Sequence, residues 1–192
     1  MKYSPPTFIA LLFQSALTLS SPVVDQTNHG SDHPIFTLHN ITYSSSTIYS
    51  TPAHLAVQDA SIQFNLTNTA VDYTTECSAF LDSDPAVFYG NQNFTCKVPP
   101  SVDPEASTNF TYASEGTNGA FEIYSIWSGG VYGDERRTFL GVGNGTAQLT
   151  CNTTSWTNTN WTPGQLYSTY EVTCSPAQLD ITPIVSHIKT QR

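Results

Sequence analysis

The sequence predicts an all-β protein, an antiparallel β-barrel or sandwich with two disulfides. Apolar and polar residues alternate with a period of two in several short windows, which is typical of half-buried strands. Turn-forming pairs such as Asp84-Pro85 and Pro163-Gly164 separate these windows. The four cysteines of the chain are Cys77, Cys96, Cys151 and Cys174.

The first element along the chain is a predicted signal peptide over residues 1–20. Lys2 precedes the apolar stretch Phe8–Leu19, and Ser20 provides a small residue at the cleavage point. This stretch is too short to cross a bilayer, so we expect no membrane association. Residues 21–33 are predicted to form a flexible arm, residues 34–185 a single β-barrel domain, and residues 186–192 a C-terminal tail.

The first strand of the domain, within Ile35–Tyr43, is predicted to contain a β-bulge. Leu38 and Ile41 are three residues apart, so strict alternation would place them on opposite faces. An extra residue near His39 would bury both side chains and turn Asn40 outward.

The later strands follow from the same alternation. Ala120–Trp127 has apolar residues at both parities, which predicts a central strand covered on both faces. Further strands are predicted over Ser61–Leu66, Asn93–Val98, Thr108–Tyr112, Thr146–Cys151 and Leu166–Cys174.

The cysteines indicate an oxidising compartment. An even number of cysteines behind a secretion signal is typical of disulfides, and four cysteines allow three pairings. We predict Cys77–Cys96 and Cys151–Cys174, because closing short loops costs the least chain entropy. The spacing is unlike the CxxC pairs of zinc sites, so no metal is expected here.

Seven Asn-x-Ser/Thr sequons support secretion and predict a glycoprotein. They begin at Asn40, Asn65, Asn93, Asn109, Asn144, Asn152 and Asn160.

The net charge of the chain argues against nucleic-acid binding. The chain carries −9 at neutral pH, whereas nucleic-acid binding needs clustered Lys and Arg. No nucleic-acid partner is therefore expected.

The sequence contains no recognised catalytic motif, so we predict a protein that is not an enzyme and has no cofactor. GxSxG, HExxH and phosphate-loop patterns are all absent from it. His29 and His33 lie in the predicted arm and are better explained as solvated than as metal ligands. Asp82 and Asp84 resemble the start of a calcium loop, but Pro85 follows, which favours a turn.

Several short motifs between Phe36 and Cys96 resemble one family. FTLHNITY and ASIQFNLTN are followed by Cys77-Ser78-Ala79, Phe88-Tyr89-Gly90 and Cys96. Together they are similar to the Alternaria major allergen family of secreted fungal β-barrel proteins, and Cys151 and Cys174 match its second bridge in order. The resemblance implies an antiparallel barrel, no catalytic activity, allergen or effector roles, and binding to plant defence proteins of the thaumatin-like class. The allergen dimerises through a further cysteine near its N-terminus. This chain has no cysteine before Cys77, so a disulfide-linked dimer is not expected.

We therefore predict a secreted, effector-like protein that binds a host extracellular protein. The alternative is a cell-wall protein that binds carbohydrate through exposed tryptophans, because aromatic rings stack on sugars. The candidate rings are Trp127, Trp156 and Trp161.

Overall fold

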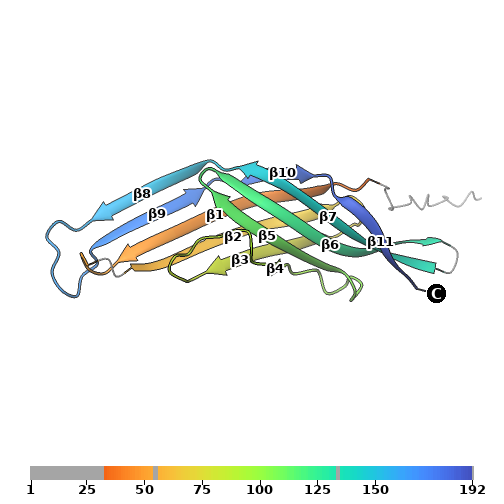
Figure 1. Cartoon of the computed structure of the whole chain (residues 1–192), viewed down its shortest axis with the longest axis horizontal. Helices are drawn as coiled ribbons and strands as arrows, with labels where there is room; N and C mark the ends of the chain where they lie inside the picture. Colours follow the sequence, from red (N-terminus) through yellow and green to blue (C-terminus); the bar gives the residue numbers. More distant parts are fainter. Residues whose placement is uncertain (1–32, 54–55, 133–134, 192) are drawn as a thin grey trace, which may run out of the picture.

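The computed structural model of the protein describes residues 33–53, 56–132 and 135–191, so the predicted signal peptide and nearly all of the predicted arm lie outside the described residues. The strands form two antiparallel sheets (Figure 1). The first sheet contains, in spatial order, β3 (Thr74–Leu81), β2 (Ala56–Asn68), β1 (Phe36–Tyr49), β9 (Ser168–Cys174) and β8 (Cys151–Thr157), and β10 (Ala177–Ile181) also pairs with β1. The second contains β11 (Ile184–Gln191), β7 (Glu135–Gln148), β6 (Asn118–Tyr132), β5 (Ser107–Glu115) and β4 (Phe94–Thr95).

The hydrophobic core lies between the two sheets and is rich in aromatic rings. Phe64 of β2 meets Phe110 of β5 edge to face, with ring centroids 5.0 Å apart, and Phe121 of β6 at 5.5 Å. Tyr112 lies 4.9 Å from the same Phe121 ring. Edge-to-face and tilted contacts of this kind add to the stabilisation from burying the rings. The predicted fold class is confirmed, in the form of two facing sheets that do not close into a barrel.

The predicted bulge in β1 is confirmed. The pairing of β1 with β10 shifts register between Leu38 and Ile41, and its pairing with β2 shifts between His39 and Thr42. Leu38 and Ile41 are both fully buried, whereas Asn40 is exposed. Asn40 also has a positive φ of 53°, a conformation that Asn tolerates better than most residues. The extra residue therefore keeps the apolar side chains of both halves of β1 in the core.

Both predicted disulfides are confirmed, and they connect different parts of the fold. Cys77 of β3 bonds to Cys96, whose backbone N–H donates to Thr108 of β5, so this bridge joins the first sheet to the second. The backbones of Glu76 and Lys97 exchange hydrogen bonds beside it. Cys151–Cys174 instead joins directly opposed residues of β8 and β9 within the first sheet.

Several segments differ from the sequence-based expectation. Asn93–Val98 contains only the two-residue β4, and Thr146–Cys151 contains the end of β7 and the first residue of β8, with Leu149 and Thr150 outside both strands. Residues 186–191, expected to form a tail, belong to β11 and pair with β7, since backbone pairing needs no apolar side chains. The segment Ala120–Trp127 is central in its sheet, as predicted, but only one of its faces is fully buried. Phe121, Ile123 and Trp127 point into the core, while Glu122 and Tyr124 are partly exposed.

Candidate functional site

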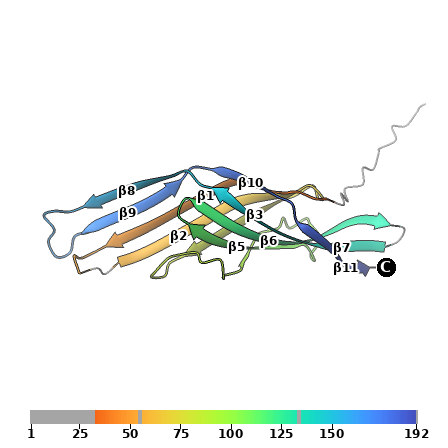
Figure 2. The ribbon, with the colours of Figure 1, turned by 45° about the horizontal axis from the view of Figure 1, so that its top comes forward.

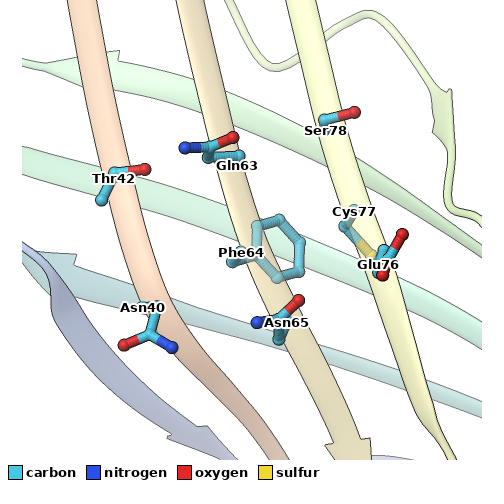
Figure 3. Close-up of a pocket in the computed structure, with 8 residues that line it drawn as sticks. All are labelled: Asn40, Thr42, Gln63, Phe64, Asn65, Glu76, Cys77 and Ser78. Carbon is cyan, nitrogen blue, oxygen red and sulfur yellow. The ribbon is translucent and has the colours of Figure 1, made fainter.

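A shallow depression lies on the outer face of the first sheet, beside the bulge (Figure 3). Its volume is about 380 Å³. It is lined by residues of β1, β2 and β3, namely Asn40, Thr42, Gln63, Phe64, Asn65, Glu76, Cys77 and Ser78.

The lining of this depression is suited to hydrogen bonding rather than to acid–base chemistry. Its polar groups are amides and hydroxyls, with Glu76 as the one carboxylate among the lining residues. That carboxylate lies 3.6 Å from Lys97 Nζ in an exposed ion pair. A glycosidase needs two facing carboxylates, and a nucleophilic site needs a base beside the nucleophile. Neither arrangement occurs among the lining residues.

All seven sequon asparagines stand at positions that can carry a glycan without burying it. Two of them, Asn65 and Asn109, are half-buried. The other five are exposed: Asn40, Asn93, Asn144, Asn152 and Asn160. Asn40 and Asn65 both line the depression. Glycosylation itself remains a prediction.

The three tryptophans have different environments, and this corrects part of the carbohydrate hypothesis. Trp127 is buried, with its ring 6.1 Å from Phe36 and 6.0 Å from Phe139, so it is unavailable to a ligand. Trp161 is half-buried, and its Nε1–H donates to the carbonyl oxygens of Ser50 and Gln165. Trp156 keeps 51% of its surface exposed.

The ends of β8, β9, β1 and β2 run past the tips of β5 and β6, as both views show (Figures 1 and 2). We call this part of the first sheet the overhang; it comprises residues 45–49, 56–59, 152–157 and 168–172. Exposed side chains on both faces reflect the missing second layer. Tyr170, which alternation places on the core-facing side with Cys174, is still 49% exposed.

A row of three apolar side chains and one threonine crosses the outer face of the overhang. Strand pairing places Trp156 beside Thr169, Thr169 beside Ile48, and Ile48 beside Val57. Ile48 is half-buried and Val57 is 68% exposed. We call Trp156, Thr169, Ile48 and Val57 the outer row. Clustered exposed apolar groups are a common mark of interaction sites.

The row of residues next to the outer row is acidic. Ser46 pairs with Glu171 on one side and with Asp59 on the other. The Ser46 hydroxyl donates to an Asp59 carboxylate oxygen at 2.8 Å. The apolar row is thus flanked by two carboxylates on the same face of the sheet.

The described residues offer neither a metal-binding group nor a membrane-spanning helix. Among the residues that the structure describes, no group of three or more His, Cys, Asp or Glu side chains could hold a metal ion. Asp82 and Asp84 are exposed, whereas His29 lies outside the described residues. No helix in the described part of the chain is long and apolar enough to cross a membrane.

Comparison with known proteins agrees with the sequence resemblance. No curated protein and no solved structure matches the chain. A family model described as Alternaria alternata allergen 1 matches residues 41–174, well over half of the chain, including all four cysteines. The match and the two disulfides are consistent with a secreted, allergen-like protein. The chain therefore belongs to the Alternaria alternata allergen 1 family.

Proposed function

We propose that this protein acts outside the cell by binding a host protein, without catalysis, and that the outer row is its contact surface. The observation that carries the proposal is the exposed indole of Trp156 at the edge of an apolar row. Binding energy at protein interfaces is concentrated in a few residues, and Trp is prominent among them. The partner class that the family resemblance implies is a thaumatin-like plant defence protein.

Two features favour the outer row over other exposed apolar residues. The row lies on paired strands, and the Cys151–Cys174 bridge fixes the base of the β8–β9 hairpin. A site on rigid strands loses little conformational entropy on binding. Charge provides the second feature. The carboxylates of Asp59 and Glu171 beside the row would guide a partner with a basic rim and would fix its orientation.

The test is to measure the affinity of the secreted protein for a purified thaumatin-like protein. We expect Trp156→Ala to weaken binding about tenfold or more, as for an interface anchor. Tyr170→Ala is the matched control, because Tyr170 is an aromatic residue of similar exposure on the opposite face of the same hairpin. It should change the affinity less than threefold, or by less than about 0.7 kcal/mol. Equal losses in the two variants, or no binding by the unaltered protein, would contradict the proposal.

Carbohydrate binding is the second candidate, and one exposed ring favours it. Trp156 has hydroxyl and amide neighbours on its face of the sheet, including Thr154 and Asn152. Such a combination of a ring and hydrogen-bonding groups can hold a sugar. Titration with soluble cell-wall oligosaccharides would distinguish the two functions. Binding of a sugar that is lost in Trp156→Ala, with no binding to the host protein, would support this second function.

A further inference from the structure

The edge strands of this protein are not equally protected against pairing with another strand. β4 has only two residues, and β11 has a register irregularity between His187 and Lys189. β3 carries the charged Glu76, whose backbone is already bonded to Lys97. Short length, bulges and charges are the usual ways to block an open edge.

β8 has none of these protections. Its sequence, CNTTSWT, contains no charged residue and no proline, and its pairing with β9 is regular throughout. It forms the end of the first sheet (Figure 1), and every residue from Asn152 to Thr157 is exposed. Thr and Trp also favour extended structure. β8 is therefore an open, regular edge.

The backbone groups that β8 leaves free can be assigned from its register. Ser175 N–H donates to Thr150 O at one end of the β8–β9 ladder, and Asn158 N–H donates to Tyr167 O at the other. Because hydrogen-bonded and non-bonded pairs alternate in an antiparallel ladder, the even-numbered residues of β8 bond to β9. The odd-numbered residues point their N–H and C=O groups outward; these are Cys151, Thr153, Ser155 and Thr157.

We propose that β8 pairs antiparallel with β8 of a second copy of this chain, about a two-fold axis at Thr154. In this register Cys151 lies opposite Thr157 of the second copy, and Thr153 lies opposite its Ser155. Each of these pairs occurs twice, so every outward N–H and C=O of β8 receives a partner. A seven-residue strand with free groups at both ends and at alternate positions between them is complementary to itself.

Charge favours a second copy at β8 over the other edges. A two-fold axis brings each surface against itself, and like charges placed opposite one another destabilise a strand pair. Two copies of a chain with net charge −9 repel each other, and β8 itself adds no charge to the interface, while Glu171 of each copy lies one strand away from the axis, beside Thr154. Pairing through β3 would instead bring two Glu76 carboxylates to one interface.

The pairing would join the two first sheets into one continuous sheet. Both outer rows would then lie on the same side, with Trp156 of each copy opposite Asn152 of the other. This pairing needs no host partner, so it is independent of the proposed function. Since a sugar on Asn152 would stand at this edge, the test uses chains with Asn152→Gln.

The test compares Asn152→Gln with two double variants that add Ser155→Ala or Ser155→Pro. The Ser155 N–H points away from β9, so proline there removes a bond to the second copy without removing one from the β8–β9 ladder. Sedimentation velocity up to about 100 µM should show twice the monomer mass for the single variant and for Ser155→Ala, because association depends on concentration. Ser155→Pro should sediment as a monomer. A monomeric single variant, or a Ser155→Pro chain that still dimerises, would overturn the proposal.

Hydrogen exchange provides a second measurement that does not depend on how well the proline variant folds. In the Ser155→Ala chain, the amides of Thr153, Ala at position 155 and Thr157 should exchange slowly when concentrated and quickly when diluted. The amides of Thr154 and of position 152, which bond to β9, should be protected in both conditions. Outward amides whose exchange does not change with concentration would refute pairing at β8.

Discussion

Gly141→Ala should destabilise the protein, because there is no room for a methyl group at this position of β7. A Cβ there would lie 2.7 Å from Cζ of Phe36 and 2.8 Å from Cζ3 of Trp127. The optimal separation of two non-bonded carbon atoms is about 3.5–4.0 Å, so both buried rings would have to move. The backbone of β7 cannot move away from these rings without breaking strand pairs, because Gly141 pairs with Ser125 on one side and with Val185 on the other.

The expected cost is about 2 kcal/mol, the middle of the range for forcing an extra methyl group into a packed core. For a chain of this size, that corresponds to a fall in Tm of about 4–8 °C. Gly129→Ala is the matched control. Its added Cβ would meet the same Trp127 ring and Phe139 at 3.7 Å, an ordinary contact distance, so its Tm should change little. Thermal melts of the oxidised protein measure both variants, and equal Tm values for the two would refute the packing argument.

Three further predictions concern the bulge, a disulfide and a buried tyrosine. Asn40→Ala should cost about 1 kcal/mol in guanidinium unfolding, because Ala tolerates the φ of 53° less well than Asn, whose short polar side chain can hydrogen-bond locally, whereas Asn40→Gly should be nearly neutral; equal costs of the two substitutions would argue against strain at this residue. Replacing Cys151 and Cys174 with Ala should cost roughly 3 kcal/mol, since it opens a loop with a sequence separation of 23; an unchanged Tm would contradict this. Burial, with a smaller contribution from Tyr43, raises the pKa of Tyr112. The unfolded chain therefore loses this proton near its usual pKa of about 10 while the native state keeps it, so stability should fall as pH rises above that value. Tyr112→Phe should make this fall shallower in melts at about pH 9 and about pH 11, and an identical fall in both proteins would exclude Tyr112 as its source.

Local sequence patterns were sufficient to predict parts of β1, β2, β5, β6 and β9, together with the bulge and the disulfides, but they did not predict β3, β10 or most of β7. Leu38 and Ile41 could not both be buried by a regular strand, so the conflict between them was visible before any partner strand was known. The two cystine loops are short, and simple closure entropy selects them. Features of this kind depend on residues that are close together in the sequence, so they can be predicted without knowing how the strands pair.

The roles of the tryptophans could not be predicted in the same way. Trp127 is buried because β6 lies across from Phe36 of β1, whereas Trp156 is exposed because β8 is at the end of its sheet. Both outcomes depend on the order of strands in space, which alternation within one strand does not determine. Ile48 and Val57 were not predicted as site residues for the same reason. They lie in one row with Trp156 only because β1, β2, β8 and β9 pair side by side.

The central position of β1 has a consequence for how the chain folds as it is made. β1 pairs with β2, which follows it closely, but its other side pairs with β9 and β10, which are among the last segments to be synthesised. At about 5–20 residues per second, the partner Ala177 follows Phe36 by roughly 7–30 s. During this time one side of β1 has no partner, and the core beneath it cannot close. Contacts so distant in sequence make folding slow, and a chain that ended before Ser168 would leave its first strand half paired.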